Sequence, residues 1–262
     1  MSTRKGPLNG IKVIELAGIG PGPYTGQLLA DMGADVIVVD RPGPALPKAV
    51  DGRGKRSVML DLKKPEAVAA LLKMVASADV LIEGLRPGVT ERMGVGPDAC
   101  HAVNPKLIYG RMTGWGQTGP WSQMAGHDIN YISMTGVLNA IGKAGQPPVP
   151  PLNMVGDFGG GTMFLVTGIL AALVERATTC KGNIVDAAII DGTHSLMSFV
   201  HGMAGLGQWR TDREANLLDG AAPFYRCYET SDGKFMAVGC IEPQFFAAMM
   251  ERLPIDKEAY GG

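Results

Sequence analysis

The chain has 262 residues, 46% of them hydrophobic, which suits one large domain or one domain and part of a second. Its 24 basic and 25 acidic residues nearly balance, so the basic excess that nucleic-acid and anionic-membrane partners normally require is missing. The N-terminus lacks a secretory apolar stretch and the longest apolar run, residues 164–174, is too short to span a bilayer, so we expect a cytoplasmic protein without a membrane partner.

The first half of the chain alternates short β-rich runs with helical patterns. Strands are expected at residues 11–16, 36–40, 57–60, 80–83 and 107–112, and helices at 24–32 and 65–78. Near-continuous apolar strands of this kind are typical of a parallel sheet that is covered on both faces. The pattern therefore predicts a doubly wound, mostly parallel, Rossmann-like α/β domain.

The second half is richer in glycine and less regular. Further elements are expected as helices at 130–141, 160–176, 187–203 and 244–252, a strand at 184–186, and a hairpin of 224–229 with 235–239. Because the texture changes after Leu218, we expect a large α/β domain over residues 1–218 and the start of a small α+β domain over residues 219–262.

A glycine-rich loop follows the first expected strand and resembles a dinucleotide-binding turn. Residues 18–23 read GIGPGP, and Asp40 ends the second strand about twenty residues later. However, Pro23 occupies the position of the third glycine, and Pro21 and Pro23 remove backbone donors that a pyrophosphate would use. A tight turn beside an active site, without a nicotinamide cofactor, is the better interpretation.

Basic residues follow the expected strands at the edge where open α/β sheets bind ligands. Arg41, Arg86 and Arg92 lie there, among other basic residues. From the residues alone, these cations form either a rim for a phosphorylated ligand or an ordinary solvated surface. Cys100, Cys180, Cys227 and Cys240 form no CxxC motif, and no His, Cys and carboxylate cluster has ligand spacing, so we expect free thiols and no metal site.

Two proton-handling side chains lie in glycine-rich segments that predict loops opening onto helices. His127 stands between Gly126 and Asp128, and Asp157 stands between Gly156 and a run of glycines. An imidazole and a carboxylate on opposite sides of one pocket can remove a proton from one face of a carbon and return it to the other, which is racemisation. The alternatives are a hydrogen-bonded structural histidine and an aspartate that caps a helix.

The surroundings of Asp157 suit an enolate intermediate. Asn153 and the nearby glycine amides are donors that could hold a developing oxyanion. Since Asp157 must carry a proton in one half-reaction, we expect burial to raise its pKa.

Seven ordered motifs resemble those of alpha-methylacyl-CoA racemases, which belong to the family III CoA-transferase (CaiB/BaiF-like) superfamily. They are LAGIGPGP at 16–23, DRP at 40–42, LDLK at 60–63, EGLRPG at 83–88, TGWGQTGP at 113–120, GHDINY at 126–131 and GDFGGG at 156–161. The resemblance covers essentially the whole chain. It implies an enzyme that interconverts (2R)- and (2S)-2-methylacyl-CoA thioesters through an enolate, with no cofactor beyond the coenzyme A of the substrate.

The resemblance also implies site residues. His127 and Asp157 match the two acid/base groups, and Glu242 matches the carboxylate that pairs with the active-site histidine. The expected contacts to CoA and the acyl thioester are Arg41, Leu60, Asp61, Leu62, Lys63, Gly84, Leu85, Arg86, Arg92, Gly126, Asp128, Ile129, Asn130 and Tyr131.

Members of the family form interlocked homodimers, and their chains continue beyond the point where this one ends, so we expect a truncated small domain here. Two alternatives stay open. One is a family III CoA-transferase in which Asp157 attacks a thioester to form a mixed anhydride. The other is an inactive CoA-binding fragment. The histidine in GHDINY favours the racemase, because the transferase reaction does not need it.

Overall fold

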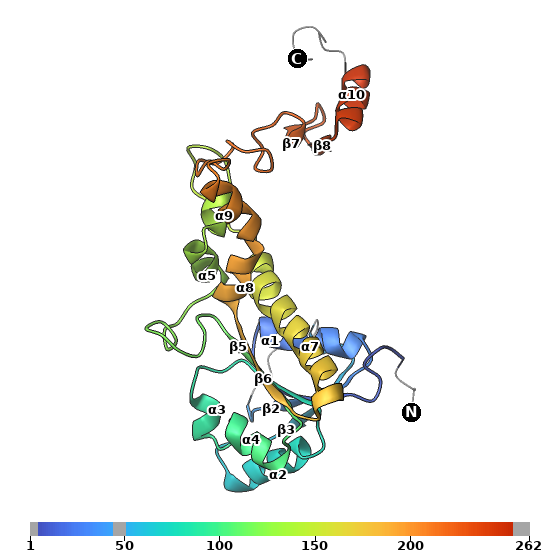
Figure 1. Ribbon diagram of the computed structural model, residues 1–262, viewed down its shortest axis with the longest axis vertical. Helices are drawn as coiled ribbons and strands as arrows, with labels where there is room; N and C mark the ends of the chain where they lie inside the picture. Colours follow the sequence, from blue (N-terminus) through green and yellow to red (C-terminus); the bar gives the residue numbers. More distant parts are fainter. Residues whose placement is uncertain (1–4, 44–50, 254–262) are drawn as a thin grey trace. The chain divides into compact units, whose positions relative to one another are not determined.

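The computed structural model describes residues 5–43 and 51–253, and its larger unit is built on a six-stranded parallel sheet (Figure 1). The strands are β1 Lys12–Leu16, β2 Asp35–Asp40, β3 Lys55–Met59, β4 Val80–Glu83, β5 Ile108–Thr113 and β6 Asn183–Ala188. They lie in the order β3-β2-β1-β4-β5-β6, which is the doubly wound order of the Rossmann fold. The predicted fold class is confirmed.

Helices cover both faces of this sheet, as the apolar strands predict (Figure 1). On one face, α1 Pro21–Asp31 and α7 Met163–Thr179 bury Leu29, Leu165 and Ile169. On the other, α2 Pro65–Val75 and α4 Pro97–Val103 bury Leu71 and Cys100. The sequence did not predict α4 or the single turn α3 Val89–Arg92, because neither is long enough to show a helical period.

Two of the predicted helices are divided in the structure. The first becomes α5 Asp128–Met134 and α6 Val137–Ala140, separated at Gly136, whose positive φ of 85° ends a regular helix. The other becomes α8 Ile189–Leu196 and α9 Ser198–Gly205.

The apolar helix predicted over residues 160–176 begins earlier, as the π-helix η1 Met154–Thr162, and continues into α7. The combined helix Met154–Thr179 is long and apolar enough to cross a membrane by length and composition alone. This helix is longer than the apolar run at residues 164–174, which is too short to predict a membrane span. Core helices of globular proteins pass the same test, and Leu165 and Ile169 of α7 are fully buried against the sheet.

The described chain divides into two compact units, Met1–Thr135 with Leu152–Met197, and Gly136–Pro151 with Ser198–Gly262. This division differs from the predicted boundary at residue 218. Within the second unit, Arg213 donates to the backbone oxygens of Asn139 and Lys143 at 3.0 and 3.1 Å, which ties residues 136–151 to the segment that follows residue 198.

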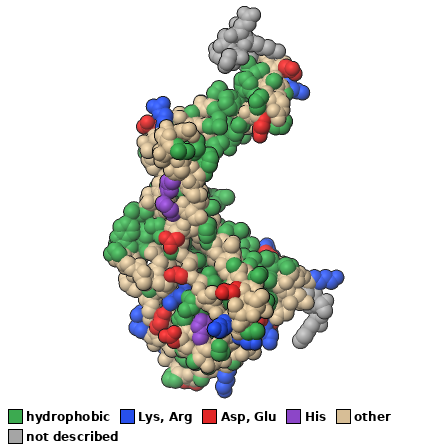
Figure 2. All heavy atoms as spheres, in the orientation of Figure 1, with side chains coloured by type: hydrophobic (Ala, Val, Ile, Leu, Met, Phe, Trp, Pro, Cys, Tyr) green, Lys and Arg blue, Asp and Glu red, His purple; other side chains and the backbone are tan. Residues whose placement is uncertain are grey.

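The second unit contains the predicted hairpin and the last described helix. The strands β7 Tyr225–Glu229 and β8 Phe235–Gly239 pair antiparallel, and α10 Pro243–Arg252 follows. Apolar side chains lie on the surface of this unit (Figure 2), including Leu206 at 72% and Phe235 at 78% exposure. Exposed apolar area of this kind is typical of a surface that another part of a protein or another chain covers.

Candidate active site

Two adjoining cavities lie within the first unit, at the carboxyl ends of the parallel strands, where open α/β sheets bind ligands. The first cavity has a volume of about 440 Å³ and is lined by both predicted acid/base residues, His127 and Asp157. The second cavity has a volume of about 930 Å³ and is lined mainly by the loops after β2 and β3. Their shared walls consist of Gly18, Ile19, Gly20, Pro23 and Leu85.

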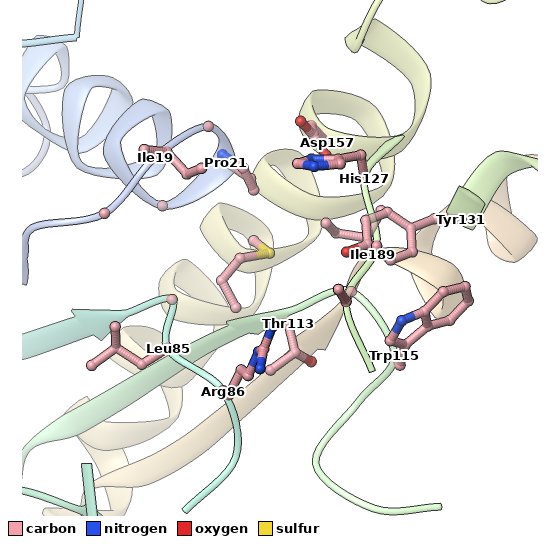
Figure 3. A pocket seen from close by; sticks show the side chains of 18 of the residues that line it. Ile19, Pro21, Leu85, Arg86, Thr113, Trp115, His127, Tyr131, Asp157 and Ile189 are labelled. Atoms are coloured by element: carbon pink, nitrogen blue, oxygen red, sulfur yellow. The ribbon is translucent and has the colours of Figure 1, made fainter. Parts of the chain in front are cut away.

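His127 is the N-cap residue of α5, and its side chain is exposed at the first cavity (Figure 3). The backbone N–H of His127 donates to Oδ1 of Asn130 at 2.9 Å, which is one half of a capping box. Asn130 therefore fixes the backbone beneath the imidazole. It does not line either cavity, although the resemblance suggested a ligand contact.

Asp157 lies in the first turns of η1 and reaches the same cavity from a different helix (Figure 3). π-Helical segments are rare and are frequent at functional sites. Burial raises the pKa of the Asp157 carboxyl, and the charge of Asp128 raises it further. A weak contact from Nδ2 of Asn153 at 3.5 Å and the charge of His127 act in the opposite direction. The predicted direction of the shift is confirmed.

The raised pKa of Asp157 gives a prediction about stability. The native carboxyl holds its proton more tightly than the unfolded one, so this contribution to stability is present below the unfolded value of about 3.9 and is lost as the pH rises through the folded value. Asp157→Asn should therefore become more stable relative to the parent as the pH rises above about 4. Chemical denaturation across a pH series measures this, with the exposed Asp98→Asn as the control. A difference that does not vary with pH would contradict the shift.

Asp128 lies behind the first cavity rather than in its lining, so its contact with the thioester stays a prediction. Its carboxylate is buried, with the residue 7% exposed, and Oδ2 accepts the backbone N–H of Asp157 at 2.7 Å. Neither cavity is lined by Asp128. The Asp157 amide is therefore already hydrogen-bonded to a carboxylate and is not free to act as an oxyanion donor.

Aromatic and sulfur-containing side chains form much of the remaining wall of the first cavity, including Met112, Trp115, Met124 and Tyr131 (Figure 3). Trp115 stacks edge-to-face on Tyr131 with ring centroids 4.8 Å apart. Gly114 and Gly126 both lie against the Tyr131 ring, and a Cβ at Gly114 would overlap with it. Gly114 and Gly126 are therefore needed because a side chain at either position would collide with the Tyr131 ring.

This packing predicts that Gly114→Ala displaces Tyr131 and lowers the free energy of unfolding by about 1–3 kcal/mol, as overpacking usually does. Urea denaturation measures the loss. Gly22→Ala is the matched control, because no heavy atom lies within 4 Å of the added methyl group there. Equal stability of the Gly114→Ala variant and the parent would contradict the close packing.

The second cavity gathers the predicted residues of the β2 and β3 loops: Arg41, Leu60, Asp61, Leu62 and Lys63. Val89 and Met93, at the two ends of α3, add apolar surface on the opposite wall. Cations beside apolar side chains are what a nucleotide with several phosphates requires.

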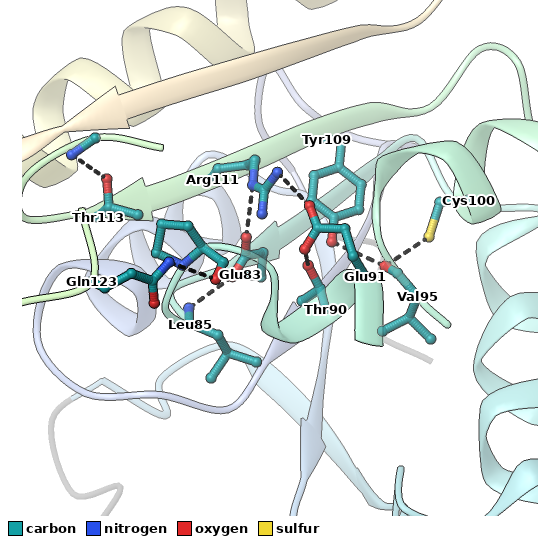
Figure 4. Close-up of polar contacts among 12 residues, drawn as sticks. Glu83, Leu85, Thr90, Glu91, Val95, Cys100, Tyr109, Arg111, Thr113 and Gln123 are labelled. Atoms are coloured by element: carbon teal, nitrogen blue, oxygen red, sulfur yellow. Dashed lines mark hydrogen bonds and ion pairs between the residues drawn. The ribbon is translucent and has the colours of Figure 1, made fainter. Parts of the chain in front are cut away.

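The loop after β4 belongs to both cavities, with Gly84 and Arg86 at the first and Leu85 at each. An ionic network, buried at Arg111 and Glu83, holds this loop (Figure 4). Nε of Arg111 donates to Glu83 at 3.0 Å, and the other carboxylate oxygen of Glu83 accepts the Leu85 N–H at 2.7 Å. Nη1 of Arg111 donates to Glu91 of α3 at 2.8 Å, so one guanidinium anchors two of the segments around the second cavity.

Four predicted site residues lie outside the lining of both cavities, besides Asp128 and Asn130. Ile129 is 44% exposed on α5, and Arg92 lies at the end of α3. Asn153 is the N-cap residue of η1 and reaches the cavity only through Asp157. Glu242 is the N-cap residue of α10 in the second unit, so its pairing with the histidine stays a prediction.

The sequence reasoning missed a buried ion pair beneath the glycine-rich loop. Nζ of Lys55 donates to Glu15 at 2.7 Å and to the carbonyl of Pro23 at 2.7 Å, and the side chains of Lys55 and Glu15 are 3% and 2% exposed. The pair therefore fixes the first turn of α1, which forms part of both cavities. The available signal was a carboxylate inside an otherwise apolar strand, because a buried charge needs a partner.

The doubly wound sheet, the paired cavities at its carboxyl edge and the imidazole and carboxylate in one of them define an α/β protein with an acid/base site. Comparison with known proteins gives the family. The model of CoA-transferase family III matches residues 8–259, and the chain belongs to that family.

Individual relatives include both an isomerase and a transferase. The chain is 48% identical to mouse alpha-methylacyl-CoA racemase over 96% of its own length and 66% of the racemase. It is 36% identical to succinate–glutarate CoA-transferase of Agrobacterium fabrum over 91% of its length and 65% of the transferase. A CaiB/BaiF family protein of Brucella suis has a similar structure, with a TM-score of 0.80 and 31% identity, over 97% of this chain and 71% of that one. The chain thus spans about two thirds of the length of the curated relatives.

Proposed function

We propose that the chain binds an acyl-CoA thioester across the two cavities. The second cavity would hold the nucleotide, where Arg41 and Lys63 offer cations to its phosphates. The pantetheine arm would cross the shared wall of Gly18–Gly20 and Leu85. The acyl group would then lie in the first cavity, against the sulfur-containing and aromatic side chains. No further cofactor is needed, because both proton-transfer groups belong to the chain.

For the reaction, we propose racemisation at the α-carbon of a 2-methylacyl-CoA by 1,1-proton transfer. For one enantiomer His127 removes the α-proton and Asp157 returns a proton to the opposite face. For the other enantiomer the roles exchange. The observation that supports this most strongly is that His127 and Asp157 line one cavity from two different helices, with the pKa of Asp157 raised by burial.

Deuterium exchange tests the proposal. The purified chain, incubated in D₂O with one enantiomer of 2-methylbutanoyl-CoA or a longer homologue, should place deuterium at the α-carbon and yield both enantiomers. Chiral chromatography with mass spectrometry separates exchange from inversion. Absence of deuterium in a chain that binds the ester would reject racemisation.

A second candidate function is CoA transfer, which the 36% identity to a CoA-transferase favours. There the carboxylate of Asp157 attacks the thioester carbonyl, the C–S bond breaks, CoA leaves as the thiolate, and an aspartyl mixed anhydride remains. Hydroxylamine added during turnover intercepts an anhydride as a hydroxamate, whereas it does not react with an enolate. Stoichiometric hydroxamate at Asp157 would favour the transferase.

The third candidate is a CoA-binding chain without turnover, which the coverage of about two thirds of the relatives keeps in view. Calorimetric binding of CoA without any exchange or transfer would identify it. We further propose a second copy of the chain as the partner that covers the apolar surface of the second unit. Sedimentation measures that association.

A further inference from the structure

A second carboxylate lies directly behind the proposed acid. Oδ2 of Asp128 accepts the backbone N–H of Asp157 at 2.7 Å, although the two residues are 29 positions apart. Asp128 is 7% exposed, and Oδ1 is buried without a hydrogen-bond partner in the described part of the chain. A buried carboxylate with one unsatisfied oxygen is energetically costly, which suggests that its charge serves a purpose.

The local structure admits this carboxylate only because residue 156 is glycine. A Cβ at Gly156 would lie 2.5 Å from Oδ2 and 2.8 Å from Cγ of Asp128. The glycine that precedes Asp157 in the sequence therefore makes space for Asp128. Asp128 is the first residue of α5 and directly follows His127, the N-cap residue. The start of this helix therefore supplies both the imidazole and the buried carboxylate.

We propose that Asp128 is a positioning residue of the racemisation suggested above: its carboxylate fixes the first turn of η1 through the Asp157 amide and, as a neighbouring anion, retains the proton on the Asp157 side chain. A nearby negative charge disfavours ionisation of a carboxyl group. The charge of Asp128 therefore favours the protonated form of Asp157, and Asp157 lies at the cavity, where that proton would be delivered to the enolate. This role rests on the proposed function.

Burial is the largest cause of the raised pKa of Asp157, and Asp128 is the charged group that adds to it. His127, from the N-cap of α5, acts in the opposite direction, and its exposed ring is screened by solvent from the charge of Asp128. Tyr131 of α5 is a neutral neighbour whose own pKa is raised by burial and by both carboxylates. On the remaining sides, Gly20 lies near the carboxylate from the α1 loop, and α8 presents Thr193 and Leu196 to the glycines of η1.

The test is Asp128→Asn, which keeps an oxygen for the Asp157 amide but removes the charge. Carbon-13 NMR of labelled aspartate carboxyls, with Asp157→Asn for assignment, follows the titration of Asp157 in each protein. We expect Asp157 to titrate at lower pH in the Asp128→Asn variant than in the parent. The rate of deuterium exchange falls with rising pH where it depends on protonated Asp157. That fall should move to lower pH by the same amount. The control is Asp98→Asn, an exposed first-turn aspartate of α4, which should leave both unchanged.

Titration of Asp157 at the same pH in the parent and in Asp128→Asn would overturn the proposal. So would titration in the parent at or below about 3.9, the value of an unperturbed aspartate, and this measurement does not depend on whether Asp128→Asn folds. Racemisation and the positioning role of Asp128 can be rejected independently of each other. A parent chain that exchanges no deuterium overturns racemisation, whereas the NMR titration still decides whether Asp128 retains the proton on Asp157.

Discussion

His127→Gln should lower racemisation by about 10²–10⁴-fold, the usual contribution of one general acid or base. The loss of α-proton exchange should differ between the two enantiomers. A two-base site assigns each enantiomer its own base, so the variant should still exchange the α-proton of the enantiomer that Asp157 deprotonates. That exchange should proceed with retention of configuration, because the other face no longer receives a proton from the imidazole.

Asp157→Asn provides the reciprocal result. It should lose exchange with the second enantiomer and keep exchange with the first. Mass spectrometry after chiral separation measures both reactions in both variants, and Trp121→Phe, a change at an exposed ring outside the lining of the first cavity, is the control. Both enantiomers losing exchange equally in each variant would contradict a two-base mechanism and favour one group acting on both faces.

Glu15→Ala should lower the free energy of unfolding by about 3–5 kcal/mol, because it leaves the ammonium of Lys55 buried without its carboxylate. Both side chains are at most 3% exposed, and their atoms lie 2.7 Å apart. The loss should also loosen the carbonyl of Pro23, which Lys55 holds, and therefore weaken binding of CoA at the shared wall. Urea denaturation and calorimetry measure the two effects.

Two controls separate charge from packing. The double variant Glu15→Leu with Lys55→Met replaces the buried pair by apolar groups and should recover most of the stability. Asp31→Ala removes a partner of Arg53 in an exposed pair, 64% and 36% accessible, and should cost far less than the loss of the buried pair, because solvent screens exposed charges. A Glu15→Ala variant no less stable than Asp31→Ala would show that the pair does not stabilise the loop.

The sequence predicted the sheet well because most of its strands are apolar runs, whereas the order of the strands came only from the structure. It also placed His127 and Asp157 in one cavity, since each lies in a glycine-rich segment before a helix. It missed α3 and α4, which are too short for a periodic pattern. The sequence did not predict that residues 136–151 belong to the second unit, because the bonds that Arg213 and its neighbours form with this segment arise only on folding.

The site was harder to predict wherever a motif residue acts on another residue rather than on a ligand. Asp128 and Asn130 both lie within GHDINY, yet one holds the Asp157 amide and the other caps α5. A linear motif does not distinguish these uses, because each depends on a contact formed by folding. The Glu15–Lys55 pair is similar, since its partners are 40 residues apart.

The most direct measurement is a structure of the chain with a thioether analogue of a 2-methylacyl-CoA, which cannot be deprotonated. The account predicts the nucleotide at Arg41 and Lys63, and the α-carbon in the first cavity. A nitrogen of His127 and an oxygen of Asp157 should face opposite sides of that carbon, each at about 3–3.5 Å, the separation of reacting atoms before transfer. An α-carbon that reaches only one of these groups, or an acyl chain outside the first cavity, would contradict it.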